Sequence, residues 1–475
     1  MFCFFHKQHT MASFALYIFL MLISLFVPSS EASGSIGINY GRVANDLPSP
    51  SKVVELLKTE GLNRVKLYDT DANVVTAFAN TSIKVIVAMP NELLSSSAAN
   101  QSFTDAWVKA NISGYHPATE IEAIAVGNEV FANNYTNYLV PAMKNVHASL
   151  TKFNLHKDIK ISSPIALSAL ETSYPVSSGS FKPELVEPVI KPMLEFLRRT
   201  GSYLMINAYP FFAYSANSDK ISLDYALFKE NPGVVDSGNG FRYTNLLDAQ
   251  IDAVYAAMSA LKYDDVNVTV TETGWPSKGD SNEIGAGEDN AASYNGNLVK
   301  RVLTGRGTPL RPNDSLNVFL FALFNENQKP GPTSERNYGL FYPSEQKVYD
   351  IPLTLTEANV NSSGVGKREV PVNGNNGSTT SFSGESWCVA SGDVGKEKLQ
   401  GALDYACGEG GADCTPIQNG ATCYNPNTLE AHASYAFNSY YQKNSRASGS
   451  CDFGGAAYVV TQPPKYGKCE FPTGY

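Results

Sequence analysis

Two glutamates stand where strand-like segments of the sequence end. Residues 267–272 alternate β-branched residues, which is typical of a β-strand, and Glu272 precedes Gly-Trp-Pro, which breaks regular structure. Residues 121–129 repeat this arrangement, because an apolar run leads there into Gly-Asn-Glu129. A carboxylate at the end of a buried strand destabilises a fold unless it has a partner. The two glutamates together therefore predict acid and nucleophile chemistry on a sugar.

Short apolar runs recur along the first 352 residues, and helix-like stretches separate them. Residues 51–59 and 246–261, for example, place apolar side chains at helical spacing. Strands that alternate with helices form a parallel sheet, and eight such units predict a closed (β/α)8 TIM barrel, an α/β fold. In that fold the carboxyl ends of the strands carry the active site. The eight predicted strands are residues 36–40, 64–68, 83–89, 121–126, 159–165, 203–208, 267–272 and 317–323.

Amides, carboxylates and aromatic rings gather at these predicted strand ends. Such groups hydrogen-bond sugar hydroxyls and stack on sugar faces. Asn128 either bonds a sugar hydroxyl or orients Glu129, while Arg42 and Asp69 are predicted to pair with each other. The alternatives are core packing for each ring and a structural ion-pair network for the charged residues. The candidates for substrate binding are Tyr40, Asn128, Tyr209, Phe212, Trp275, Glu326, Lys329 and Glu335.

The composition describes a globular protein with a large core and few charges. Of the 475 residues, 43% are hydrophobic and 17% are charged, and the formal net charge is −9. This charge argues against nucleic-acid or anionic-membrane binding and favours a neutral substrate. The sequence shows no metal-ligand spacing, no Gly-rich phosphate loop and no Gly-X-Ser-X-Gly elbow, so we expect no metal and no cofactor.

The first 32 residues are predicted to be a signal peptide. The apolar run 14–27 is short of the roughly 20 residues that span a membrane, although an uncleaved anchor is the alternative. No hydrophobic tail follows Cys469, so no lipid-anchor signal is expected. We expect a secreted monomer of the extracellular space or cell wall. The sequence has eight Asn-X-Ser/Thr sequons. Asn267 is a poor candidate for a glycan because it begins a predicted strand, and Asn313 is also not among those predicted. The sequons predicted to carry glycans are Asn80, Asn100, Asn111, Asn134, Asn361 and Asn376.

Six of the seven cysteines lie between Cys388 and Cys469. This distribution predicts a large domain, residues 33–357, and a small disulfide-stapled domain, residues 386–475. Residues 358–385 are rich in Asn, Gly and Ser and are predicted to be a flexible linker. Six cysteines allow fifteen connectivities, and spacing alone does not choose among them. Zinc binding is the alternative, but the small domain has no Cys-X-X-Cys and export favours disulfides.

The large domain resembles plant β-1,3-glucanases of glycoside hydrolase family seventeen. The resemblance is carried by residues 37–42, 64–69, 125–129, 207–212, 271–277 and 324–329. It implies endo-hydrolysis of β-1,3-glucan with retention of configuration, with Glu272 as nucleophile and Glu129 as acid/base. Retention requires the two carboxyl groups to lie about 5–5.5 Å apart. Glu326, Lys329 and Glu335 match accessory cleft residues, and a nearby Lys329 would keep Glu272 or a neighbour ionised.

The small domain, which starts Trp387-Cys-Val-Ala, resembles the X-eight carbohydrate-binding module, also called family forty-three. This resemblance implies β-1,3-glucan as partner and the disulfides Cys388–Cys451, Cys407–Cys469 and Cys414–Cys423. Three alternatives stay open: a transglucosylase, a mixed-linkage β-glucanase, and a non-catalytic protein that binds cell-wall glucan. The aromatic candidates for glucan contact, each with core packing as its alternative, are Tyr424, Tyr435, Tyr440, Tyr441 and Phe453.

Overall fold

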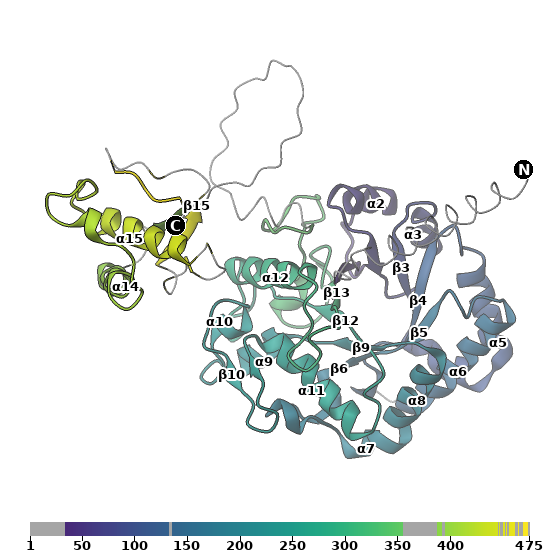
Figure 1. Ribbon diagram of the computed structural model, residues 1–475. Helices are drawn as coiled ribbons and strands as arrows, with labels where there is room; N and C mark the ends of the chain where they lie inside the picture. Colours follow the sequence, from purple (N-terminus) through teal and green to yellow (C-terminus); the bar gives the residue numbers. More distant parts are fainter. Residues whose placement is uncertain are drawn as a thin grey trace, which may run out of the picture. The chain divides into compact units, whose positions relative to one another are not determined.

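The computed structural model forms two compact units, Met1–Gly366 and Lys367–Tyr475 (Figure 1). The predicted signal peptide, the predicted linker and the sequons at Asn134, Asn361 and Asn376 lie outside the described residues. Within the described part, no helix is long and apolar enough to cross a membrane. The described residues are 34–132, 135–354, 387–391, 395–444, 446, 450, 451, 453, 456–460, 464 and 469–473.

Parallel strands of the first unit form a closed ring. Around the ring the order is β5-β4-β3-β2-β1-β13-β12-β9-β6. Only Ser163 separates β5 from β6, so these two segments form one barrel strand, which pairs with β4 on one side and β9 on the other. The predicted eight-stranded (β/α)8 barrel is therefore confirmed. The strands are β1 (Ser35–Asn39), β2 (Arg64–Lys66), β3 (Lys84–Met89), β4 (Glu120–Val126), β5 (Lys160–Ser162), β6 (Pro164–Ala166), β9 (Leu204–Asn207), β12 (Val268–Thr273) and β13 (Asn317–Leu320).

Helices surround this ring (Figure 1). Helix α2 shows why they form: Pro50 suits the first helical position, and Val53, Val54 and Leu57 pack inward at helical spacing. The long helices are α2 (Pro50–Thr59), α5 (Gln101–Val108), α6 (Thr136–Lys152), α8 (Lys191–Thr200), α11 (Leu246–Ala260) and α12 (Glu288–Leu303). Shorter helices are α3 (Ala72–Ala77), α4 (Leu94–Ala99), α7 (Pro183–Leu185), α9 (Pro210–Ala216) and α10 (Leu223–Ala226).

Short elements complete the connections of the barrel. Two small antiparallel hairpins are formed by β7 (Leu170–Thr172) with β8 (Ser180–Phe181), and by β10 (Val234–Val235) with β11 (Arg242–Tyr243). Single helical turns are η1 (Asn91–Leu93), η2 (Lys109–Ser113), η3 (Val130–Ala132), η4 (Leu167–Ala169), η5 (Val176–Ser178), η6 (Val186–Ile190) and η7 (Thr333–Arg336).

The barrel strands present alternate residues to two separate cores. Val65, Leu67 and Val85 pack with helix residues in the large core between strands and helices. Their strand neighbours Ile86 and Phe319 belong to a small cluster made almost wholly of strand residues, which fills the barrel interior. The interior is therefore packed rather than open, and polar side chains are left for the carboxyl ends of the strands.

In its described residues, the second unit contains two helices and a two-stranded antiparallel sheet. Strands β14 (Trp387–Ala390) and β15 (Ala457–Val460) pair antiparallel, and the helices are α14 (Lys396–Cys407) and α15 (Leu429–Lys443), with a single turn η8 (Thr415–Ile417) between them. Both helices contribute buried residues to one core, in which Phe437 is fully buried. Tyr435 and Tyr441 are also buried there, so they are core residues rather than glucan contacts.

The disulfides correct two of the three pairings implied by the resemblance. Cys388–Cys451 is confirmed, but Cys407 bonds to Cys414, and Cys423 bonds to Cys469. The expected Cys407–Cys469 and Cys414–Cys423 bonds are wrong.

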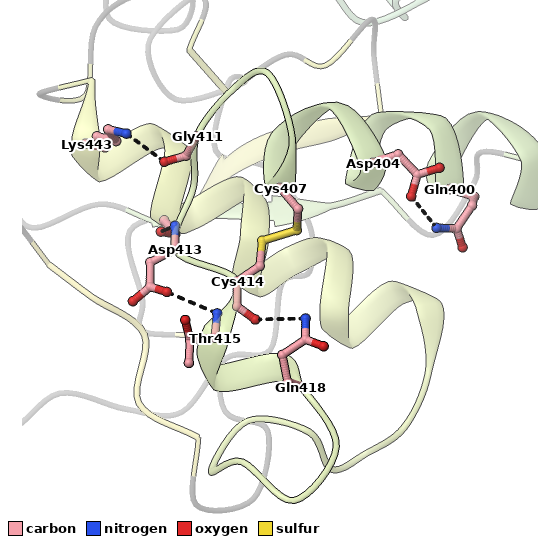
Figure 2. Close-up of a disulfide and its surroundings, with 10 residues drawn as sticks. Gln400, Asp404, Cys407, Gly411, Asp413, Cys414, Thr415, Gln418 and Lys443 are labelled. Atoms are coloured by element: carbon pink, nitrogen blue, oxygen red, sulfur yellow. Dashed lines mark hydrogen bonds between the residues drawn. A yellow bond between two sulfur atoms is a disulfide. The ribbon is translucent and has the colours of Figure 1, made fainter.

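The reason for the correction is local. Cys407 ends α14, and Cys414 directly precedes η8 (Figure 2). The loop between them turns back through Gly411, whose φ of +65° suits glycine, and Lys443 donates a hydrogen bond to the Gly411 carbonyl. This places the two Cα atoms 5.7 Å apart, within the range that a disulfide spans.

Candidate active site

Glu272 is buried at the carboxyl end of β12 and accepts two side-chain hydrogen bonds. Lys66 Nζ donates to Oε1 at 2.8 Å, and the Tyr209 hydroxyl donates to Oε2 at 3.0 Å. The register of β12 shifts after Val270 in its pairing with β9 and with β13. Such an irregularity re-aims the following side chain, and here it precedes Glu272.

Lys66 reaches Glu272 through the interior of the barrel. It ends β2, and its neighbours Val65 and Leu67 pack outward against helices, so Lys66 points inward. Its side chain is 1% exposed, and Nζ lies 4.0 Å from the centroid of the Tyr68 ring. Sequence reasoning missed this residue. The available signal was a charged residue at the end of a buried strand, the same signal that identified Glu272.

Glu272 is held ionised by its surroundings. Burial acts to raise the pKa of its carboxyl group, but the charge and hydrogen bond of Lys66, together with the Tyr68 and Tyr209 hydroxyl groups, outweigh burial and lower the pKa. Burial lowers the pKa of Lys66, and the charge of Glu272 opposes that change. A carboxylate with a lowered pKa is suited to act as a nucleophile.

Glu129 lies at the end of β4 and has the opposite shift. Burial raises the pKa of its carboxyl group, and the negative charge of Glu272 raises it further, while the hydrogen bond from Asn207 acts to lower it. Asn207 Nδ2 donates to Glu129 Oε1 at 2.7 Å. The Thr271 hydroxyl donates to Asn207 Oδ1 at 3.0 Å and so fixes which end of the amide faces Glu129. A carboxyl group with a raised pKa is suited to donate a proton.

The turn that carries Glu129 has a left-handed backbone. Gly127 has φ +70° and Glu129 has φ +50°. The Asn91 side chain accepts from the Asn128 amide at 2.8 Å and donates to the Asn128 carbonyl at 3.0 Å. A Cβ at position 127 would lie 2.7 Å from the Val130 side chain, so only glycine fits there. The turn is thus fixed on both sides of Asn128.

One cleft of about 960 Å³ contains both glutamates at the mouth of the barrel. A cleft of this size lies within the range of small-molecule and saccharide sites. All but one of the predicted substrate-binding residues line it. They are Tyr40, Asn128, Tyr209, Phe212, Glu326, Lys329 and Glu335.

Trp275 is the exception, and its predicted contact with substrate is wrong. The ring is 0% exposed, and its Nε1 donates to the Gly285 carbonyl at 2.8 Å. It packs against Phe211, Tyr214 and Tyr294, with centroid separations of 5.3–5.8 Å. A ring enclosed in this way cannot stack on a sugar, so Trp275 supports the cleft from beneath.

Replacing Trp275 should affect stability, whereas replacing Phe212 should affect substrate binding. Trp275→Ala removes a fully buried ring, and we expect it to lower the free energy of unfolding by about 3–5 kcal/mol. Phe212 is 45% exposed and lines the cleft, so Phe212→Ala should leave unfolding nearly unchanged and raise KM. Urea unfolding and steady-state kinetics measure both effects. Equal stability losses in the two variants would contradict the assignment.

The charged residues on the β1 side of the cleft have partners other than Glu272. Glu326 Oε1 accepts from the Val43 amide at 2.7 Å, and burial raises the pKa of its carboxyl group. Lys329 Nζ lies 3.0 Å from Glu335 Oε2. The partner of Glu272 is thus Lys66, and Lys329 is bonded elsewhere. The predicted pair of Arg42 with Asp69 is confirmed.

The asparagines of the described sequons differ in their exposure to solvent. Asn80 and Asn100 are exposed, and Asn100 also caps α5, where its side-chain oxygen accepts two amide hydrogen bonds. Asn111 is half-buried, and its Nδ2 donates to the Trp107 carbonyl at 2.9 Å. The nitrogen to which a glycan would be attached is therefore already bonded within the folded chain. No group of three or more metal-ligating side chains occurs among the described residues.

A (β/α)8 barrel whose mouth holds two carboxyl groups with opposed pKa shifts, amid amides and aromatic rings, has the architecture of a glycoside hydrolase. Residues 36–353 match the model of glycosyl hydrolases family 17, and residues 386–458 match the X8 domain. The chain belongs to glycosyl hydrolases family 17.

Curated relatives match nearly the whole chain in sequence. Glucan endo-1,3-beta-glucosidase 13 of Arabidopsis thaliana is 42% identical over 460 residues, which are 96% of this chain and 88% of the relative. Glucan endo-1,3-beta-D-glucosidase of Olea europaea is 39% identical over 466 residues, 98% of each chain. The solved structure of CJP38, a beta-1,3-glucanase and allergen of Cryptomeria japonica pollen, superposes with a TM-score of 0.65 at 42% identity, over 68% of this chain and 99% of that one.

Proposed function

We propose that this chain hydrolyses internal β-1,3-glucosidic bonds of β-1,3-glucans and retains the anomeric configuration. The observation that carries the proposal is the opposed shift of the two cleft carboxyl groups, lowered for Glu272 and raised for Glu129. Retaining glycoside hydrolases need one ionised and one protonated carboxyl group. The names of the relatives, which are glucan endo-1,3-beta-glucosidases, support β-1,3-glucan as the substrate.

In the first step, Glu272 forms a bond to the anomeric carbon as the bond to the leaving oxygen breaks. Glu129 gives its proton to that oxygen, and the released glucan chain departs. The ester that forms removes the charge of Glu272, which had raised the pKa of Glu129. The pKa of Glu129 then falls, so its carboxylate takes a proton from water in the second step. The resulting hydroxide equivalent attacks the anomeric carbon and frees Glu272.

The neighbouring side chains position these two groups. Lys66 and Tyr209 bond one oxygen each of Glu272 and keep it ionised before attack. Asn207 bonds Glu129 and directs its carboxyl group into the cleft. The amide, hydroxyl and aromatic groups among the lining residues suit a glucan, which has many hydroxyl groups. We further assign glucan binding to the X8 domain, and the extracellular cell wall as the location.

Product analysis of the full chain on laminarin tests the proposal. We expect a mixture of oligosaccharides early in the reaction, and the β anomer as the first product in proton NMR. Curdlan and barley β-glucan serve as comparison substrates, because they separate β-1,3 from mixed linkage. A first-formed α anomer would contradict retention. Lengthened oligosaccharides would identify a transglucosylase, and binding without turnover would identify a non-catalytic glucan-binding protein.

A further inference from the structure

The cleft has a polar end that the proposed reaction does not use. Ser168 and Ser173 line this end from the segment that follows β6, and Gln250 lines it from α11. All three side chains are uncharged. Gln250 Oε1 is buried and, among the residues that the structure describes, has no hydrogen-bond partner. A buried amide oxygen without a partner is unfavourable, so this group is prepared for a donor from a ligand.

This polar end lies across the barrel mouth from β1. The ring has eight strands, and the combined β5 and β6 segment stands four positions from β1. The cleft includes Val43, which follows β1, and Ser168 and Ser173, which follow β6. It therefore crosses the mouth of the barrel from one side to the other. A linear ligand that reaches Gln250 extends along the β6 side of this path.

The segment that presents Ser173 is held firmly. Its hairpin, β7 with β8, packs on α11, and Gly179 approaches the Ala253 carbonyl so closely that a Cβ would collide with it. Ser177 donates to Asp236 from its amide at 2.6 Å and from its hydroxyl at 2.7 Å. Tyr174, which directly follows Ser173, is 76% exposed. The backbone of this segment is therefore held in place before any ligand binds, which limits the entropy cost of binding.

We propose that Gln250, Ser168 and Ser173 form a distal subsite that binds one glucosyl unit of a bound glucan chain. The Gln250 amide exchanges hydrogen bonds with sugar hydroxyls, and the two serine hydroxyls complete the polar contact. The uncharged lining selects a neutral sugar over an acidic one. This inference rests on the proposed function, since it names a subsite of the same cleft.

Kinetics on β-1,3-gluco-oligosaccharides of increasing length test the subsite. Gln250→Leu keeps a similar volume and removes the amide, so we expect KM for long oligosaccharides to rise about fivefold, the effect of one or two hydrogen bonds. The kcat values, and all constants for the shortest hydrolysed oligosaccharide, should be unchanged. Ser173→Ala should act in the same direction. Tyr138→Ala, a change of a 41% exposed tyrosine on α6, is the control and should alter nothing.

An equal rise of KM at every length, or no rise at any length, would overturn the subsite. Thermal unfolding of each variant shows that the fold is intact. Binding of a long oligosaccharide to Glu272→Gln, measured by calorimetry with and without Gln250→Leu, tests the subsite without turnover. Loss of affinity on Gln250→Leu supports it, and unchanged affinity overturns it. Failure of the wild-type chain to release sugar would count only against the proposed function.

Discussion

The Glu272→Gly variant is expected to lose about 10⁴-fold or more of its activity on laminarin. The two carboxyl groups act as one catalytic unit, so no neighbouring group can take over the role of the missing nucleophile. Azide should restore turnover of an activated β-glucoside, since a small anion can occupy the space that the carboxylate leaves. The product should be the α-glucosyl azide, because azide attacks once and from the side of Glu272. Proton NMR of the product gives the anomeric configuration directly.

Glu129→Gly provides the matched comparison. In the proposed mechanism Glu272 still forms the glycosyl-enzyme of this variant, and azide replaces water in the second step, so the expected product is the β-glucosyl azide. Glu55→Gln, an exposed glutamate of α2, should leave activity unchanged. A β product from Glu272→Gly would reverse the two assignments. No rescue in either variant would contradict the double-displacement mechanism.

Lys66→Met is the second variant with a large expected effect. In the wild-type chain Lys66 outweighs burial and keeps the pKa of Glu272 below its usual value. Without the ammonium group, only tyrosine hydroxyl groups oppose the effect of burial, so the pKa of Glu272 rises. The acidic limb of kcat/KM should therefore move to higher pH, and kcat should fall at mildly acidic pH. Lys66→Arg keeps the charge and should restore the position of the limb.

The free energy of unfolding should also depend on pH through the lowered pKa of Glu272. Because the pKa of Glu272 is lower in the folded than in the unfolded state, this group stabilises the fold above its unfolded pKa, and the contribution is lost as pH falls through the folded pKa. Removing only Lys66 leaves a buried carboxylate without its cation, at a cost of about 3–5 kcal/mol near neutral pH. Adding Glu272→Gln removes the unpaired charge and should recover part of this loss. A double variant less stable than Lys66→Met would contradict the pairing.

The barrel and its two glutamates could be predicted from the sequence because both are local patterns. Each strand of a parallel barrel is buried on two faces, so it reads as a short apolar run that ends in polar residues. The positions of Glu129 and Glu272 follow from that pattern, as does the pair of Arg42 with Asp69.

Contacts across the ring could not be predicted in this way. Lys66 and Glu272 are 206 residues apart in sequence and meet only because the ring closes. Trp275 has the residue type of a sugar platform, but the direction of its side chain is set by Phe211 and Tyr294 beneath the cleft. The pairing of Cys407 with Cys414 depends on how one glycine-containing loop turns back. In each case the three-dimensional neighbour, rather than the residue type, decided the outcome.

The left-handed backbone at Glu129 has a consequence for how this site can vary. Asn and Asp adopt φ near +50° more readily than Glu does, so either would relieve strain at this turn, which is of order 1–3 kcal/mol. Glu129→Asp should therefore be tolerated by the fold, yet it withdraws the carboxyl group by one methylene from Asn207 and from the cleft. Glu129 therefore has the side-chain length that reaches Asn207, although its backbone conformation suits a shorter side chain better.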